Sequence, residues 1–164
     1  MLYLSLITLG ICVEYIGMFH LFPYLFSQKT YSLGKENGKS IVYIVGISLL
    51  SYLIYYLIPD GEFENRVLHG LSGGFVSIVA CFFAAKDLQM FQGFSVNRVQ
   101  YFVLSFLVVM FLGIVNEIAE CFLQNIFGFI AAATINDTWF DLISNLIGAV
   151  TAISITIPFI QAKK

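Results

Sequence analysis

The sequence predicts an all-α polytopic membrane protein whose single domain crosses the bilayer five times. Only 11% of its residues are charged, whereas soluble domains carry about 25%. The mean hydropathy is +0.89. The apolar residues gather in five stretches, each close to the roughly 20 residues that a transmembrane helix needs. The chain is short enough for one membrane domain, which we place at residues 1–164.

Prolines and polar connections delimit the five expected helices. Pro23 and neighbouring aromatic residues close the first, and Pro59 stops the second. No basic stretch precedes the first helix, so we expect it to remain as a membrane span. The uncharged connection at 126–137 is expected to lie in the interface or to dip back into the bilayer. The helices are predicted at about residues 2–26, 40–58, 67–85, 99–125 and 138–160.

The basic residues predict the orientation of these helices. In a five-helix arrangement, Arg66 falls on one side of the membrane and all other Lys and Arg residues fall on the opposite side. Because basic residues are enriched in cytoplasmic loops, the N-terminus is predicted outside and the C-terminus inside. The residues on the predicted inner side are Lys29, Lys35, Lys39, Lys86, Arg98, Lys163 and Lys164.

Four carboxylates lie in a region that has no basic residue. Between Arg98 and Lys163 the chain contains no Lys, Arg or His. An acid in hydrocarbon is costly unless it is paired, protonated or bound to a metal. These acids are therefore the strongest indication of function. They are Glu117, Glu120, Asp137 and Asp141.

The fourth expected helix carries two of these acids near its outer end. Glu117 lies 18 residues after Val99, which is a rise of about 27 Å in a hydrocarbon core about 30 Å thick. Glu117, Glu120 and Gln124 are spaced so that they share one helix face. For Glu120, simple contact with water is an equally good explanation.

The fifth and third expected helices bring further polar groups to the same depth. Asp137, Asp141 and Asn145 form one stripe at i, i+4, i+8 spacing. His69 lies in the first turn of the third helix, just after Arg66. We therefore expect the polar ends of three helices to converge, although His69 also fits an ordinary interfacial histidine.

The stripe on the fifth helix has a purely structural alternative. Thr138 and Asp141 match a capping box, and Asn136 or Asp137 is placed to cap the same helix end. Asn145 is suited to an interhelical hydrogen bond, which is worth about 0.6 kcal/mol in membranes.

Glu14 is a separate intramembrane acid. It lies about 18 Å along the first helix, near the midplane. We expect it either to be protonated and hydrogen-bonded or to line a polar cavity that reaches the outer cluster. Three cysteines lie singly in apolar runs and are interpreted as buried hydrophobic residues.

A Gly-x-Ser-Gly string around Ser72 matches a short motif of rhomboid proteases. Both histidines, His20 and His69, precede this serine, and a histidine on a later helix is absent. Gly70 and Gly74 form a small-xxx-small pair, so helix packing explains the string better than proteolysis does.

The polar motifs resemble those of a group of small bacterial membrane proteins. They are R-x-x-H-x-x-x-G-G-F from Arg66 to Phe75, E-x-x-E from Glu117, and D-x-x-x-N-x-x-G from Asp141. Together they are similar to the VanZ-like and YjdF-like group over about residues 66–149. This resemblance implies a cell-envelope protein and, through the VanZ-like family, reduced sensitivity to glycopeptide-type antibiotics.

We therefore predict a multi-pass cell-membrane protein with an acidic site at the outer leaflet. The expected ligand is the headgroup of a lipid or an envelope precursor, and both catalysis and binding fit these residues. The candidate catalytic residues are His69, Glu117 and Asp141. The candidate substrate-binding residues are Glu120, Asn145, Arg66 and Glu14. The candidate metal ligands are Glu117, Glu120, Asp141 and His69, a set that suits Mg, Mn, Ca or Zn.

The alternative hypothesis is a non-enzymatic proton or cation pathway, or a membrane scaffold protein. Glu14 near the midplane favours a pathway, because intramembrane carboxylates often relay protons. The lipid bilayer is the one partner common to both hypotheses. The few scattered basic residues predict no nucleic-acid partner.

Overall fold

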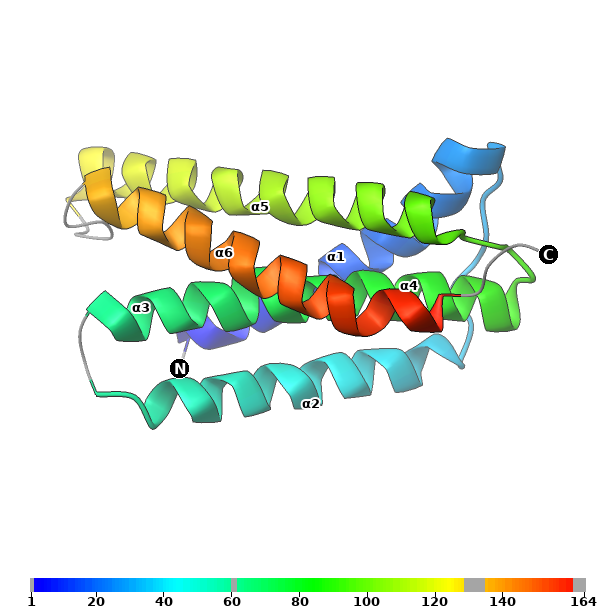
Figure 1. Ribbon diagram of the computed structural model, residues 1–164, viewed down its shortest axis with the longest axis horizontal. Coiled ribbons are helices and arrows are strands. Elements are labelled where there is room, and N and C mark those ends of the chain that lie inside the picture. Colours follow the sequence, from blue (N-terminus) through cyan, green and yellow to red (C-terminus); the bar gives the residue numbers. More distant parts are fainter. Residues whose placement is uncertain (1, 60–61, 129–134, 161–164) are drawn as a thin grey trace.

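Five long helices run alternately in opposite directions along the chain (Figure 1). The computed structural model describes residues 2–59, 62–128 and 135–160. In these ranges all regular elements are helical, and five helices are long and apolar enough to cross a membrane. The predicted all-α architecture with five spans is therefore confirmed. The elements are α1 (Leu2–Ser27), α2 (Asn37–Tyr56), α3 (Glu62–Leu68), η1 (His69–Val76), α4 (Ser77–Phe91), α5 (Arg98–Phe127), α6 (Ile135–Thr156) and η2 (Ile157–Phe159).

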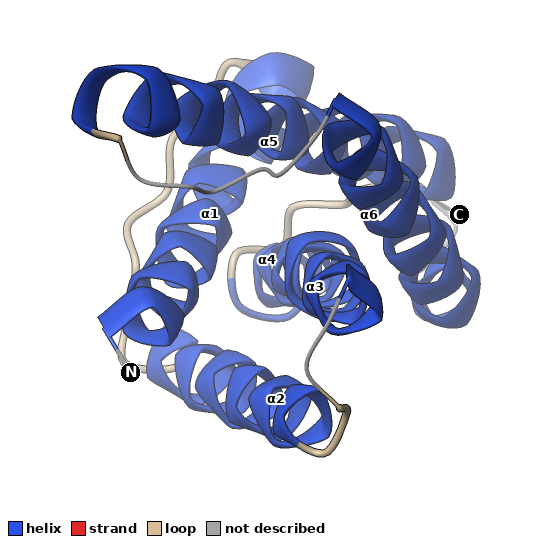
Figure 2. Cartoon of the chain, turned by 90° about the vertical axis from the view of Figure 1, so that its left-hand side faces the viewer, coloured by secondary structure: helices blue, strands red, loops and turns tan. Residues whose placement is uncertain are grey.

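The third long helix forms the centre of the bundle. The segments α3, η1 and α4 form one continuous rod. In the most apolar stretch of this rod 61% of the residues are buried, whereas the same share for the other four spans is 28–33%. Figure 2 shows α1, α2, α5 and α6 arranged around this rod. A central helix buries several faces at once, so the rod positions the side chains of all its neighbours.

The rod is longer than the predicted helix at 67–85. It begins at Glu62 and ends at Phe91, so the segments interpreted as connections at both ends are partly helical. At its start the sequence EFENRVL is rich in good helix formers. At its end Asp87 and Leu88 are buried in the bundle, and this burial keeps a charged segment helical.

Other helix boundaries also differ from the prediction. Helices α2 and α6 begin at Asn37 and Ile135, each three residues earlier than expected, whereas α1 ends at Ser27, one residue after its predicted end. Helix α5 reaches Phe127 and ends at Gly128, which has a left-handed backbone with φ of 71°. Most of the connection predicted to lie in the interface or to re-enter the bilayer falls at 129–134, outside the described residues.

A capping box fixes the start of α5. The side chain of Asn97 accepts a hydrogen bond from the backbone N–H of Gln100 at 2.9 Å, and the Gln100 side chain accepts one from the Asn97 N–H at 3.0 Å. This start sets the depth that the later residues of α5 reach in the bundle.

Glycines bring α6 and η1 into backbone contact. A Cβ atom added to Gly148 would overlap the carbonyl oxygen of Gly70, and one added to Gly74 would overlap the carbonyl oxygen of Asn145. This contact supports the helix-packing interpretation of Gly70 and Gly74. The segment η1 is π-helical, a widened form often found at functional sites.

The described basic residues gather at one end of the bundle, apart from Arg66. Arg66 lies on α3, at the opposite end, which we call the α3 end. The gathered residues are Lys29, Lys35, Lys39, Lys86 and Arg98. Lys163 and Lys164 lie outside the described residues. The charge asymmetry agrees with the expectation, and the choice of the face that lies outside stays a prediction.

Candidate metal and ligand site at the α3 end

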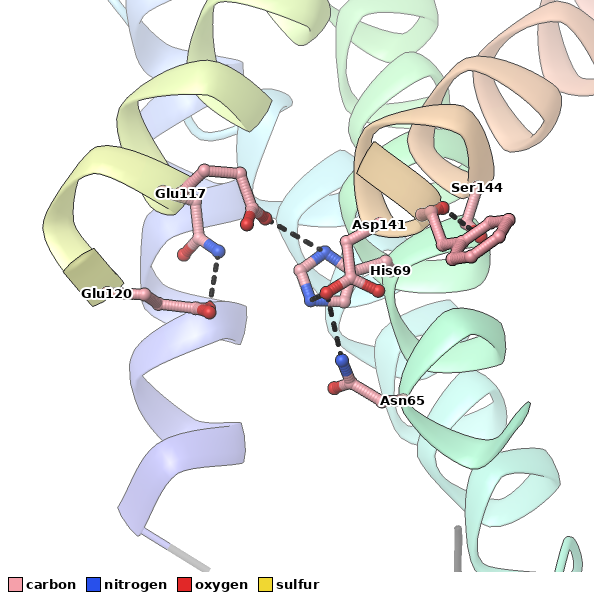
Figure 3. Close-up of polar contacts among 8 residues, drawn as sticks. Asn65, His69, Glu117, Glu120, Asp141 and Ser144 are labelled. Atoms are coloured by element: carbon pink, nitrogen blue, oxygen red, sulfur yellow. Dashed lines mark hydrogen bonds and ion pairs between the residues drawn. The ribbon is translucent and has the colours of Figure 1, made fainter. Parts of the chain in front are cut away.

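His69 lies between two carboxylates that come from two different helices (Figure 3). Its Nδ1 atom is 3.8 Å from Oε1 of Glu117 on α5, and its Nε2 atom is 3.6 Å from Oδ2 of Asp141 on α6. All three side chains are buried. These separations are too long for hydrogen bonds, so they are contacts between ionisable groups. The predicted convergence of three helices is thus seen for these three residues.

Asp141 is held in place by α3 and does not cap its own helix. It is 2% exposed, and its Oδ2 accepts a hydrogen bond from Nδ2 of Asn65 at 3.0 Å. The capping-box alternative with Thr138 is wrong, because α6 starts at Ile135 and Thr138 is already inside the helix. Asp137 and Asn136 likewise follow the first helical residue, and Asp137 lies in the first turn.

Glu117 is a buried carboxylate that lacks a close hydrogen-bond donor among the described residues. Its side chain is 6% exposed, and neither carboxylate oxygen has a hydrogen-bond partner in the part of the chain that the structure describes. A buried carboxylate in this condition is unfavourable unless it is protonated or a cation compensates it. Of the three residues, Glu117 is therefore the one whose negative charge would gain most from an additional positive group.

Glu120 and Arg66 lie beside this trio. Glu120 is half-buried, and its Oε1 accepts a hydrogen bond from Nδ2 of Asn116 at 2.7 Å (Figure 3). Arg66 places its guanidinium carbon 4.2 Å from the ring centre of Phe140, a cation–π contact between α3 and α6. Neither residue is part of the closely spaced group formed by His69, Glu117 and Asp141.

The three central side chains have the composition and spacing of metal ligands. One ligand atom from each of His69, Glu117 and Asp141 lies within 4.8 Å of the other two. Zinc ligands stand about 2.0–2.2 Å from the ion, so neighbouring ligand atoms are roughly 3–3.5 Å apart. The observed separations of 3.6 and 3.8 Å run to opposite nitrogens of the imidazole, so one ion bound to either nitrogen needs the carboxylate on the other side of the ring to move toward it.

The imidazole orientation also suits a metal site. One ring nitrogen faces Glu117 and the other faces Asp141. An ion at one nitrogen would lie beside the carboxylate on that side, and the second ring nitrogen would donate to the other carboxylate until that side chain turned to the ion as well. One imidazole with two carboxylates is a donor set typical of Zn²⁺ and Mn²⁺.

A cavity of about 450 Å³ reaches this site at His69, whereas Glu117 and Asp141 are not among its lining residues. Leu6 and Gly10 on α1, and Leu112 and Leu123 on α5, line it and are also exposed on the outer surface. Its open side therefore lies between α1 and α5, on a surface that faces lipid in a membrane. The polar residues that line it are Glu14, His69, Ser72, Ser77, Asn116 and Asn145.

Glu14 and Asn145 join the site through this cavity. Glu14 lines this largely apolar cavity and also accepts a hydrogen bond from Sγ of Cys81 at 3.5 Å, so each of the two alternatives for Glu14 is met in part. Asn145 is 2% exposed, and its Oδ1 makes no hydrogen bond to any described residue. An added Cβ on Gly73 would overlap that Oδ1, and one on Gly113 would lie 3.1 Å from its Nδ2. The two glycines make room for the amide beside the cavity.

Two residues near the site were not singled out by the sequence. Asn65 was assigned to a turn-like connection, but it lies on α3 four residues before His69 and so shares its helix face. Ser72, which was considered only as a protease serine, has its Oγ 3.3 Å from that of Ser51 on α2. The signal that could have identified Asn65 is the helical spacing of the third helix. Extended back to Glu62, this spacing places Asn65 on the same face as His69.

The five apolar spans and the buried imidazole–carboxylate group define the class of this chain as an integral membrane protein. The family described as "Predicted membrane protein (DUF2238)" matches residues 5–162, and the chain belongs to this family. The match carries neither the VanZ-like nor the YjdF-like name. No curated protein and no solved structure matches the chain.

Proposed function

We propose that the protein holds a divalent metal ion between His69, Glu117 and Asp141 and binds the headgroup of a lipid or lipid-linked envelope precursor there. The site would lie at the outer leaflet of the cell membrane. One observation carries the proposal: ligand atoms from three helices lie within 4.8 Å of one another in a buried site whose Glu117 oxygens make no hydrogen bond to described residues.

Charge balance supports a divalent ion. Two carboxylates and a neutral imidazole together carry a charge of −2, which a +2 ion cancels. An imidazolium in place of the ion leaves one negative charge uncompensated among these three side chains. In a low-dielectric interior an uncompensated charge is expensive. Arg66 acts on Asp141 from outside the group and offsets part of this charge, and a +2 ion cancels it within the group itself.

The shape of the cavity supports a lipid-type ligand. Its open side between α1 and α5 would admit a molecule from the bilayer, and its wall is largely apolar. A bound Mg²⁺, Mn²⁺ or Zn²⁺ offers open coordination positions to phosphate oxygens. An anionic headgroup at the α3 end would therefore contact the ion while an apolar part lies against Leu6 and Leu112.

Metal analysis tests the proposal directly. Purified protein is equilibrated with Mn²⁺ or Zn²⁺, dialysed, and its metal content measured by mass spectrometry. We expect about one ion per chain, and an affinity at least tenfold weaker in Glu117→Gln and Asp141→Asn. Glu120→Gln is the matched control, because Glu120 lies on the same helix outside the three-ligand group. Equal losses in all three variants, or no metal in the wild type, would refute the proposal.

The resemblance to VanZ-like proteins supports a role in the cell envelope. Cells that produce the protein should tolerate a lipoglycopeptide antibiotic better than cells that produce Glu117→Gln or Asp141→Asn at the same level.

A reporter fused to the C-terminus tests the orientation. If the site faces outside, the C-terminus lies inside, and a reporter fused after Lys164 should be active only inside the cell. A reporter that is active outside would place the site on the cytoplasmic face and exclude the outer-leaflet role.

A proton or cation pathway is the second candidate function, and Glu14 on the same cavity is the observation that favours it. Ion flux into liposomes that contain the purified protein is the measurement. Flux that disappears in Glu14→Gln would support the pathway, and flux that is absent from the wild type would exclude it.

A further inference from the structure

We infer that the inner part of the cavity binds the ammonium group of an amphipathic ligand, with Glu14 as its counter-ion. Glu14 is 7% exposed and lines the cavity from α1. Its Oε1 accepts a long hydrogen bond from Sγ of Cys81 at 3.5 Å, and its Oε2 makes no hydrogen bond to the described residues. The inference rests on the proposed function only in using the same cavity, and it requires no metal ion.

The polar atoms that the cavity leaves unsatisfied indicate a ligand with hydrogen-bond donors. Among its described lining residues, two have a buried side-chain atom without a hydrogen-bond partner, and both atoms are acceptors: Oε2 of Glu14 and Oδ1 of Asn145. Both atoms are buried behind the cavity wall, so a ligand donor reaches them only when neighbouring side chains move, and until then they are costly. A primary ammonium brings three donors and one positive charge, which matches a single carboxylate.

The position of Glu14 separates this ligand group from the proposed metal. Cys81, whose thiol donates to Glu14, lies twelve residues after His69 along the rod, and Ser77 on the same cavity lies eight residues after it. Glu14 has no place in the three-residue metal-ligand group found among the described residues. One carboxylate near a thiol and a hydroxyl suits a monovalent cation better than a divalent one.

The walls of the cavity indicate that the ammonium group is attached to an apolar body. Leu6, Ile7 and Ile11 follow one another on the α1 side, and Leu112 faces them from α5. The open side between these helices faces lipid. A hydrophilic amine would leave these surfaces uncovered, whereas an alkyl chain covers them. The ligand class is therefore a lipophilic primary amine, either a free amphiphile or an amine-bearing lipid headgroup.

Calorimetric titration in phosphatidylcholine nanodiscs tests this inference with three probes. They are n-octylammonium, its neutral analogue n-octanol, and ethylammonium, which has the charge without the chain. We expect n-octylammonium to bind wild-type protein at least tenfold more tightly than either of the others. In Glu14→Gln its affinity should fall at least tenfold, to the level of octanol. Equal binding of octylammonium and octanol to the wild type would overturn the inference without any variant.

Two controls separate loss of charge from loss of fold. Glu14→Asp keeps the carboxylate and should retain more octylammonium binding than Glu14→Gln. Metal binding at His69, Glu117 and Asp141 should be unchanged in Glu14→Gln, which shows that the bundle is intact. Loss of metal binding in Glu117→Gln with normal octylammonium binding leaves this inference standing, so the failure of either idea is recognised separately.

A further titration, in nanodiscs of a different lipid composition, identifies the source of the ammonium group. Nanodiscs that also contain phosphatidylethanolamine offer the protein a lipid-borne primary amine. Weaker apparent octylammonium binding in these nanodiscs assigns the site to an amine-bearing headgroup. Unchanged binding assigns it to free lipophilic amines. Octylammonium binding that is the same in Glu14→Gln as in the wild type in both kinds of nanodisc contradicts the inference.

Discussion

Two buried carboxylates in this bundle have opposite surroundings. Asp87, near the end of α4, accepts hydrogen bonds from the Tyr15 hydroxyl at 2.6 Å and the Asn37 amide at 3.1 Å, and that amide also donates to Tyr15 at 2.8 Å. Glu117, at the α3 end, makes no hydrogen bond to described residues and faces His69 at 3.8 Å. The first carboxylate belongs to a complete network, and the second does not.

This difference indicates a structural role for Asp87 and supports the functional role proposed for Glu117. A buried network whose members satisfy one another rigidifies the fold, and Asp87 with its partners links α1, α2 and α4. A buried carboxylate without donors stays costly until a cation or a ligand reaches it. Asp87 is 4% exposed and Glu117 is 7% exposed. Because the two values are so similar, burial alone does not distinguish the two acids.

The largest expected effect is on stability, in the Asp87 network. Asp87→Ala removes the shared acceptor of Tyr15 and Asn37, and the unsatisfied donors should lower the free energy of unfolding by about 2–3 kcal/mol. Unfolding in mixed micelles followed by circular dichroism is the measurement. Glu36→Ala, an exposed acid before α2, is the control and should stay within about 0.5 kcal/mol of wild type. A loss as small as in the control would show that the network is not structural.

The opposite result is expected at Glu117. Glu117→Gln should weaken metal binding about 100-fold, because it removes one of three ligands. Without metal its stability should equal that of the wild type or exceed it by about 1 kcal/mol, because an uncompensated buried charge is lost. Metal titration and unfolding of metal-free protein measure the two quantities. A stability loss as large as that of Asp87→Ala would remove the distinction between the regions.

A smaller effect is expected at the residue that holds Asp141. Asn65→Ala deletes the hydrogen bond to Asp141 Oδ2, and the loss of this supporting contact should weaken metal binding about tenfold. Because Asn65 is exposed, stability should change little. Asn65→Asp is a useful second variant, since an additional negative charge there cannot donate to the carboxylate. Metal binding by Asn65→Ala that equals wild type would show that Asp141 needs no support from α3.

The smallest effect is expected beside the cavity. Gly73→Ala places a methyl group against Oδ1 of Asn145, the end of a side chain that can rotate away. We expect octylammonium affinity to fall about threefold while the free energy of unfolding changes by less than about 1 kcal/mol. Gly148→Ala is the contrasting variant, because its methyl group would meet the Gly70 backbone and should destabilise the bundle strongly. Equal stability losses in both variants would contradict this account.

Prediction from the sequence succeeded where a local property decides the outcome. Hydropathy located all five spans, because a membrane helix must be apolar over its own length. Helical spacing and depth placed His69, Glu117 and Asp141 at one end. The third helix was predicted too short, because its charged ends are stabilised by contacts with other helices.

The Asp87 network was not foreseen for the same reason. Asp87 falls in a stretch interpreted as a connection, and its partners Tyr15 and Asn37 come from two other helices. No periodicity within one segment relates these three residues. The capping-box alternative for Asp141 failed because it depended on a helix start at 138, whereas α6 begins at Ile135.

The sequence by itself determined that this protein is a five-span membrane bundle with acids unbalanced by nearby basic residues, because hydropathy and charge are properties of consecutive residues. Only the tertiary structure decided which acids meet which partners. Asp87 received donors from α1 and α2, whereas Glu117 and Asp141 received one imidazole between them. Side-chain partners across helices depend on helix rotation and on close glycine contacts such as that of Gly148 with Gly70, which spacing along one chain does not specify.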